Sequence, residues 1–421
     1  MPRNGRGSAA GRVKSRCRAS PARAWFLALL GFLSLTACPG LRAEAPGFLV
    51  RAHKMVAALS LEERAAQVLL VGVDGRLRFS EASLAMVRSL GPGGVMLFGF
   101  NIPEKAGDLA APLAGLQDAA AASGAGLPLI VALDHEGGGV FRFHGGITRP
   151  PSPLETGSRG PGFARLLGER VGRELRALGV NFVLGPVVEG LTVANQAFLG
   201  SRSFGRDPVH VDEVAGAYIE GLTLGGVASS AKHFPGNGSI DPHAGLPSLE
   251  MSREAFAREY LPRFASAIRA GVPSIMLSHV LVPAYDARNP ATLSPALVGG
   301  LLRGRLGFEG VILTDDLLMK ALSMPPRRSA VEALAAGADL LMLSSGDAAL
   351  PVRDALVAAV KKGVLPESRL TEAAVRVVAL KLRFGLEASL DPAARSKALA
   401  AFPGLVAESA TLLDASLHRP R

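Results

Sequence analysis

Eight short apolar segments recur along this chain, and each is followed by a loop and a helical stretch rich in Ala, Leu and Arg. Short, nearly uninterrupted apolar runs are typical of strands buried on both faces of a parallel sheet. The segments are 68–73, 94–97, 129–133, 180–183, 227–231, 274–277, 311–314 and 339–343. Eight strands alternating with helices predict an α/β fold, a (β/α)8 TIM-type barrel in one catalytic domain, with a doubly wound open sheet as the structural alternative.

Helix signals support this alternation. Ser60 with Glu63 forms a capping box before the first strand, and Gly385 is placed to end a helix whose apolar face includes Val375 and Leu382. We predict four parts: a signal peptide over residues 1–37, a tether over 38–50, the barrel domain over 51–390 and a partly helical tail over 391–421.

The N-terminal segment has the pattern of an export signal. Seven Lys and Arg residues and no Asp or Glu precede Cys38, and an apolar run too short to span a bilayer leads to Leu35-Thr36-Ala37-Cys38, which resembles a bacterial lipobox. We therefore expect an exported lipoprotein, lipidated at Cys38 and anchored to the membrane surface on the periplasmic or cell-surface side. The alternative is an ordinary signal peptide with an accidental Cys.

The charge and the cysteines exclude two classes of function. The net charge is +10, but the seven cations before Cys38 leave about +3 on the rest, which gives no electrostatic case for binding nucleic acid. Once Cys17 is removed with the signal, no thiol pair remains for a disulfide or a Cys-based metal site.

Polar residues follow the apolar runs at several strand ends. In a barrel, functional residues gather at the carboxyl ends of the strands. Such a set of acids, histidines and cations is suited to binding the hydroxyl groups of a sugar. The candidates are Asp134, His135 and Glu136 after the third strand, Arg202 in the loop before the fifth, Lys232 and His233 after the fifth, Ser278 and His279 after the sixth, and Asp315 and Asp316 after the seventh.

Asp241 and His243 form an Asp-x-His pair in a Gly/Pro-rich loop after the fifth strand. A carboxylate against one ring nitrogen leaves the other nitrogen free to move protons, as an acid/base histidine requires. The alternative is a plain surface turn.

Each candidate also has a structural interpretation. Asp134 could cap a helix, Lys232 and His233 could belong to a buried ion-pair network, and His279 could be a core histidine with satisfied hydrogen bonds. One of Asp315 and Asp316 could be an N-cap, and Arg202 could pair with Glu189. His-x-x-x-His spacing, a Gly-x-Ser-x-Gly elbow and a phosphate-binding P-loop do not occur in the sequence. We expect no cofactor and no metal, with a metal hydrolase as a minor alternative.

Taken together, five motifs resemble glycoside hydrolase family 3, in particular its bacterial β-N-acetylglucosaminidase (β-hexosaminidase) subgroup, over most of residues 60–385. The motifs are Gly93-Gly94-Val95 through Asn101, Asp134-x-Glu136-Gly137-Gly138, Arg202-Ser203-Phe204-Gly205, Lys232-His233-Phe234-Pro235-Gly236 and Thr314-Asp315-Asp316-Leu317-x-Met319. The resemblance implies a retaining mechanism with a covalent glycosyl-enzyme intermediate. It implies Asp315 as nucleophile, His243 as general acid/base oriented by Asp241, and a structural role for Asp316.

The resemblance also implies how a sugar is bound and which one it is. It implies sugar-binding roles for five residues: Asp134, Arg202, Lys232, His233 and Met319. We expect a monomer that removes terminal β-linked N-acetylglucosamine from peptidoglycan fragments or chitooligosaccharides. The alternatives are a β-glucosidase or β-xylosidase, a phosphorylase, and a catalytically weak lipoprotein that binds muropeptides.

The sequence departs from the family pattern at four places. Asn237 stands where the family usually has His, and Glu189 stands where it has Asp. Gly139 replaces an Arg, which predicts a changed aglycone or subsite preference. The loop from Gly238 to Asp241 is about two residues shorter than in relatives, which affects the reach of His243.

Overall fold

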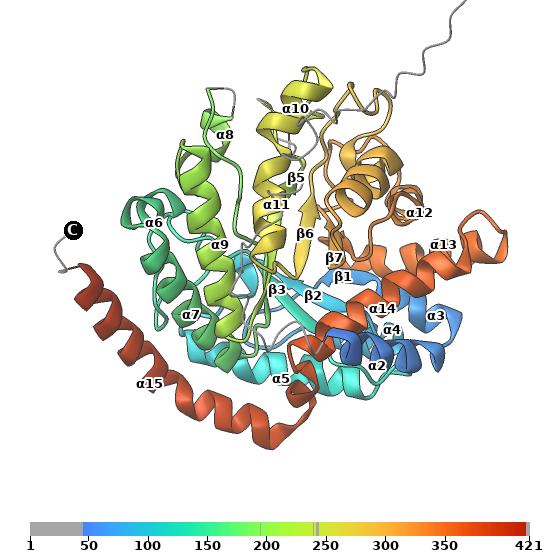
Figure 1. The fold of residues 1–421 in the computed structure, drawn as a ribbon. Coiled ribbons are helices and arrows are strands. Elements are labelled where there is room, and N and C mark those ends of the chain that lie inside the picture. The colour runs from blue at the N-terminus through green and yellow to red at the C-terminus, as the bar shows by residue number, and fades with distance from the viewer. Residues whose placement is uncertain (1–44, 194, 239, 241–243, 418–421) are drawn as a thin grey trace, which may run out of the picture. The chain divides into compact units, whose positions relative to one another are not determined.

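The computed structural model describes residues 45–193, 195–238, 240 and 244–417. The expected signal peptide with Cys38, and the pair Asp241 and His243, lie outside the described residues. The described residues from Ala45 onward form one compact unit, and its ribbon is shown in Figure 1.

Eight strands form one barrel-like sheet. They are β1 Leu69–Gly72, β2 Gly94–Leu97, β3 Ile130–Leu133, β4 Phe182–Val183, β5 Ala228–Phe234, β6 Ser274–Leu277, β7 Val311–Thr314 and β8 Leu341–Leu343. Neighbouring strands pair in parallel in the order β7-β6-β5-β4-β3-β2-β1-β8. A parallel bridge between Leu313 and Leu340 joins β7 to the start of β8. The predicted (β/α)8 barrel is therefore confirmed.

Helices surround the sheet on the outside of the barrel (Figure 1). The α-helices are α2 Ala45–Ala57, α3 Leu61–Gln67, α4 Glu81–Leu90, α5 Ala110–Ala121, α6 Pro153–Arg159, α7 Pro161–Leu178, α8 Gln196–Leu199, α9 Pro208–Leu224, α10 Arg253–Glu259, α11 Leu261–Arg269, α12 Pro326–Ala336, α13 Ala349–Lys361, α14 Glu367–Arg383 and α15 Pro392–Leu417. A π-helix, η6 Ala296–Arg305, lies between β6 and β7. The 3-10 turns are η2 Gly99–Asn101, η3 Ala106–Leu109, η4 Gly200–Arg202, η5 Ala291–Leu293, η7 Gly346–Ala348 and η8 Leu386–Leu390.

Alternation along the strands divides the core into two layers. Residues such as Leu70, Met96 and Ile130 form the interior cluster of the barrel, whereas Leu69 and Val71 belong to the larger cluster shared with the helices. This follows from strand geometry, in which successive side chains point to opposite faces. Both faces are apolar, so the strands are recognisable in the sequence as continuous apolar runs.

Helix ends follow the local signals in most places. Ser60 and Glu63 form the expected capping box at α3, and α14 ends at Arg383, two residues before Gly385 in the left-handed conformation. Helix α2 begins at Ala45, inside the segment assigned to the tether, and α15 occupies most of the tail.

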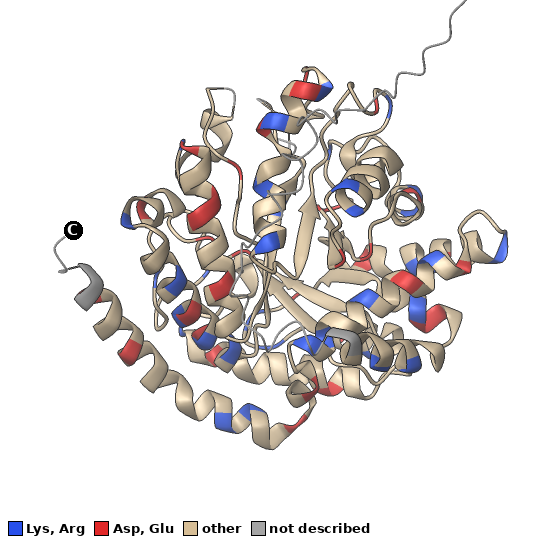
Figure 2. Cartoon of the chain, in the orientation of Figure 1, with Lys and Arg blue, Asp and Glu red and all other residues tan. Residues whose placement is uncertain are grey.

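Charged residues of both signs are interspersed along the outer helices (Figure 2). Within the described part of the chain, no helix has the length and apolar character of a membrane span.

Candidate active site

The polar ends of the strands line one cavity of about 340 Å³. This cavity lies at the carboxyl ends of the strands, because its lining includes residues at or directly after the ends of β3, β5 and β7. Its polar lining residues are Asp134, Glu136, Arg142, Arg202, Lys232, His233, Asn237, Asp315 and Asp316, and its apolar ones include Met276, Met319 and Met342. The structure therefore brings Asp134, Arg202, Lys232, His233, Met319 and Asp315 together, as the sequence predicted.

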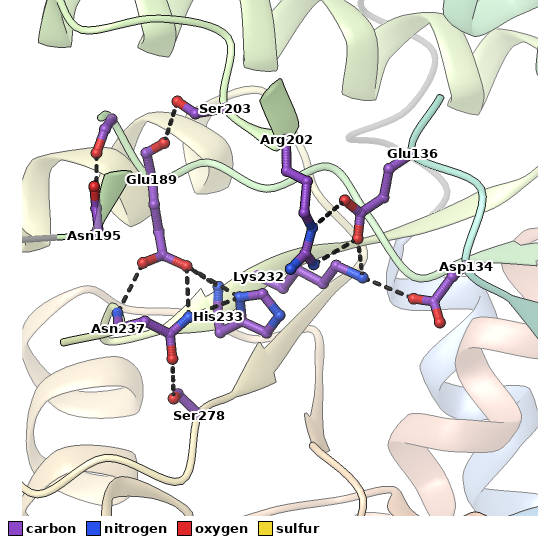
Figure 3. Close-up of polar contacts among 11 residues, drawn as sticks. Asp134, Glu136, Glu189, Asn195, Arg202, Ser203, Lys232, His233, Asn237 and Ser278 are labelled. Carbon is purple, nitrogen blue, oxygen red and sulfur yellow. Dashed lines mark hydrogen bonds and ion pairs between the residues drawn. The ribbon is translucent and has the colours of Figure 1, made fainter. Parts of the chain in front are cut away.

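Lys232 lies at the centre of an ionic cluster (Figure 3). Its Nζ atom is 2.8 Å from Asp134 Oδ1 and 2.6 Å from Glu136 Oε1. The Arg202 guanidinium forms a bidentate pair with Glu136, with Nε and Nη2 at 2.8 and 2.9 Å from its two oxygens. Arg142 Nη2 lies 3.2 Å from Asp134 Oδ2.

Neighbouring charges decide the ionisation of this cluster. Burial alone would raise the pKa of Glu136, but Lys232 and Arg202 together lower it to about 2. Burial likewise opposes ionisation of Asp134, yet Lys232 holds its pKa below the ordinary value. The pKa of Lys232 is raised because both carboxylates outweigh its desolvation. At neutral pH the cluster is fully ionised, which suits it to orient polar hydroxyl groups.

Two of the structural interpretations are wrong in detail. Asp134 caps no helix: it pairs with Lys232, and the next helix, α6, begins at Pro153. Arg202 pairs with Glu136, not with Glu189. The interpretation of Lys232 as a member of a buried ion-pair network is confirmed, and the same residue also lines the cavity.

Glu189 organises a second polar network beside the ionic cluster. Its carboxylate accepts hydrogen bonds from His233 and Asn237 at 2.7–3.2 Å, and Ser278 donates to Asn237 Oδ1 at 2.7 Å. His233 Nδ1 lies 3.0 Å from Glu189 Oε1, which can only accept, and 3.1 Å from Asn237 Nδ2, which itself donates to the same carboxylate oxygen, so Nδ1 carries the proton. In the neutral ring Nε2 is then an acceptor for a substrate hydroxyl group.

Asp315 and Asp316 have different surroundings although they are adjacent. Asp315 lines the cavity, and its Oδ1 accepts the amide proton of Asp316 at 2.8 Å. Asp316 Oδ1 instead accepts from the amides of Leu318 and Ser344, at 3.1 and 3.0 Å. Asp316 therefore ties the loop after β7 to the end of β8, whereas the Asp315 side chain makes no such link between the two strand ends.

His279 is a buried histidine with satisfied hydrogen bonds, as the structural interpretation held. Its Nδ1 is 2.7 Å from the Thr292 hydroxyl group and its Nε2 is 3.0 Å from the Asp316 carbonyl oxygen. It is fully buried, and its contact with the Asp316 carbonyl oxygen supports the loop that carries Asp315.

Three residues that line or support the cavity were not among the predicted site residues: Glu189, Asn237 and Arg142. Glu136 was named among the strand-end candidates without a role of its own, and the signal available for Glu189 and Asn237 was that both depart from the pattern of the family that the sequence resembles. Among the residues that the structure describes, no group of three or more His, Cys, Asp and Glu side chains is arranged to hold a metal ion.

Known proteins are similar to this chain in both sequence and fold. The glycosyl hydrolase family 3 N-terminal domain matches residues 60–380. A beta-hexosaminidase from Alkalilimnicola ehrlichii is 36% identical over 296 residues, which cover 67% of this chain and 82% of the relative. A family 3 β-N-acetylglucosaminidase from a Paenibacillus species superposes with a TM-score of 0.75 at 35% identity, covering 78% of this chain and 64% of its own. LpqI of M. tuberculosis superposes with a TM-score of 0.71 at 32% identity, covering 78% and 96%.

Proposed function

The chain belongs to glycosyl hydrolase family 3, and on that premise we propose that it is a retaining exo-β-N-acetylglucosaminidase of exported, lipid-anchored type. One observation carries the proposal: Asp315 lines the same cavity as the ionised cluster of Asp134, Arg202 and Lys232. A carboxylate facing a set of fixed donors and acceptors is what nucleophilic attack on a bound sugar requires. The names of the relatives support the N-acetylated sugar as substrate.

The proposed reaction has two steps. In the first, a carboxylate oxygen of Asp315 attacks the anomeric carbon, the bond to the leaving oxygen breaks, and His243 gives that oxygen its proton. In the second, His243 takes a proton from water, the resulting hydroxide attacks the anomeric carbon, and the Asp315 carboxylate is released. Asp241 orients His243 in both steps.

Replacing Asp315 by Asn tests the nucleophile. We expect Asp315→Asn to lose turnover of an aryl N-acetyl-β-glucosaminide by at least about 1,000-fold, and a 2-fluoro sugar to label Asp315 in the wild-type protein. Asp316→Asn is the matched neighbour, and its effect should come with a loss of thermal stability because its side chain bonds two amides. A wild-type protein that forms no covalent adduct and turns over no glycoside would instead be a muropeptide-binding lipoprotein.

A panel of aryl glycosides tests the sugar. N-acetylglucosaminide should be hydrolysed faster than glucoside or xyloside, and the reverse order would assign a β-glucosidase or β-xylosidase. Comparing products in phosphate and in phosphate-free buffer separates hydrolysis from phosphorolysis. Peptidoglycan fragments and chitooligosaccharides, compared as competing substrates, then identify the natural class.

Lipidation is tested at Cys38. In a bacterial host the wild-type protein should partition with the membrane fraction and carry a lipid on Cys38, and Cys38→Ser should be released in soluble form. Soluble, unmodified wild-type protein would support the ordinary signal peptide instead.

A further inference from the structure

We propose that Glu189 and Asn237 are a matched pair of positioning residues, which together hold His233 and the start of the acid/base loop in place. The inference rests on the proposed function, because it assigns these residues a role in the same reaction. They lie 48 positions apart in the sequence. The structure places them in direct contact.

The contacts between the two residues use both oxygens of the carboxylate. Glu189 Oε2 accepts the backbone amide of Asn237 at 2.7 Å, and Oε1 accepts its side-chain Nδ2 at 3.0 Å. Oε1 also faces the backbone amide and Nδ1 of His233, at 3.2 and 3.0 Å. One carboxylate thus holds both His233, which lines the cavity, and the backbone at Asn237, at the start of the loop that follows β5 (Figure 3).

Neighbours hold the pair on both sides. Ser203 Oγ donates to the carbonyl oxygen of Glu189 at 2.6 Å, and Ser278 Oγ, after β6, donates to Asn237 Oδ1 at 2.7 Å. Because the serine donates to Oδ1 and the carboxylate accepts from Nδ2, the orientation of the Asn237 amide is determined. Asn237 therefore links the loop after β4 to the end of β6.

The fit between the two side chains depends on their lengths. Glu189 and Asn237 are 4% and 1% exposed, so neither has room to adjust freely. Compared with an Asp and a His in the same two places, Glu189 is longer by one methylene group and Asn237 is smaller. The length of the carboxylate therefore matches the size of its partner, and a change in either side chain alone should not be tolerated.

A double-mutant cycle tests this compensation. Glu189→Asp withdraws the carboxylate from His233 and Asn237, and Asn237→His overfills the buried site while Glu189 is present. We expect each single variant to lower kcat/KM for an aryl N-acetyl-β-glucosaminide by about 10-fold or more, since small displacements of positioning groups have large effects on rate. The double variant E189D/N237H should return to within about threefold of wild type, where independent sites would give a loss of about 100-fold.

Glu189→Gln tests the positioning role apart from length. The amide keeps the shape of the side chain but turns a donor toward donors, so it should no longer hold the Nδ1 proton of His233. We expect kcat to fall by about 100-fold and the pH profile of kcat/KM to change, whereas a purely structural role would change thermal stability alone. Glu213→Asp, at an exposed position of α9, is the control for shortening a glutamate and should be neutral.

Each outcome decides between the hypotheses. Single and double variants whose losses simply multiply would overturn the matched pair, as would an active Glu189→Gln protein with an unchanged pH profile. If wild type turns over no N-acetylglucosaminide, the proposed function fails instead. The cycle is then measured on whichever glycoside of the panel is cleaved, or on thermal midpoints, and rescue in the double variant is still required. If Glu189→Gln does not fold, the length cycle alone decides.

Discussion

Lys232 Nζ lies 2.6 Å from Glu136 Oε1 in the interior of the barrel mouth, and both side chains are almost completely buried. Glu136 also accepts hydrogen bonds from Arg202 Nε and Nη2. A single carboxylate is therefore the ionic partner of two cations. Glu136→Gln would leave Lys232 and Arg202 facing an uncharged amide. Breaking one partner of a buried ion pair costs about 3–5 kcal/mol, and we expect a loss of this order in the free energy of unfolding.

A surface pair provides the control for this prediction. Arg159 and Glu155 form an ion pair on α6 with the glutamate half exposed, and Glu155→Gln should cost less than about 1 kcal/mol. The effect of Glu136→Gln should also depend on pH. The pKa of Glu136 is lowered to about 2 in the folded protein, so its stabilisation is complete above pH 4.5 and is lost as the pH falls toward 2. Equal losses for the two glutamine variants at pH 7 would contradict the assignment.

The sequence predicted the strands and the strand-end residues, and the physical reason is geometric. Strands buried on both faces are visible as apolar runs, and in a parallel barrel the residues after those runs must converge at one end. Asp134, Lys232 and Asp315 were therefore placed together without knowledge of any loop. The structural role expected for Asp316 is likewise consistent with its two bonds to backbone amides.

Partner choice among long side chains could not be predicted in this way. The sequence suggested Glu189 as the partner of Arg202, but the path of the loop before α9 brings Arg202 to Glu136 instead. The contact between Glu189 and Asn237 joins two irregular segments whose paths no periodicity defines. The start of α2 at Ala45 was missed for a related reason, because a short Ala-rich segment owes its helicity to packing, here against α14.

His279 is expected to act on the reaction without touching the substrate. Its Nε2 faces the carbonyl oxygen of Asp316, which can only accept, so Nε2 carries a proton, and Nδ1 faces the Thr292 hydroxyl group, which also donates to the Ser278 carbonyl oxygen at 3.0 Å. His279→Leu removes this support for the loop after β7. We expect kcat to fall by about 10- to 100-fold with a smaller change in KM.

Thr292→Val is the matched comparison for His279. It removes the hydroxyl partner of Nδ1 but keeps the Nε2 bond to Asp316, so kcat should fall less than in His279→Leu. Steady-state kinetics on an aryl N-acetyl-β-glucosaminide measure both variants. Equal losses would mean that the Nε2 bond to Asp316, which Thr292→Val keeps, does not itself support the reaction.

His135 is expected to make the protein sensitive to acid. Its ring packs against Phe141 and Phe143, with centroids 5.2 and 5.7 Å away, and neither ring nitrogen has a hydrogen-bond partner among the described residues. Burial lowers its pKa to about 4. Between pH 6.5 and 4 the unfolded chain therefore binds a proton that the folded protein does not, and stability falls as the pH decreases. His135→Leu should remove this dependence, so that its thermal midpoint relative to wild type rises on going from pH 7.5 to pH 4.5. A constant difference would argue against the assignment.

Lys381 of α14 should make the stability of the protein depend on pH in the alkaline range. Its Nζ atom donates to Gln67 Oε1 at 2.7 Å beside the start of β1, and the side chain is 1% exposed. Burial lowers its pKa to about 7. Between pH 7 and 10.5 the unfolded chain binds more protons than the folded one, so this residue makes stability rise with pH, and below pH 7 the cost of burying the charge is complete.

Lys381→Met removes that cost, on the order of 4–5 kcal/mol, but leaves the Gln67 oxygen without its donor. The thermal midpoint of Lys381→Met relative to wild type should therefore be higher at pH 6 than at pH 10. Lys361→Met, which removes the exposed ion pair with Glu62, should show no such reversal, and the same difference at both pH values for Lys381→Met would show that the buried amine is not the titrating group.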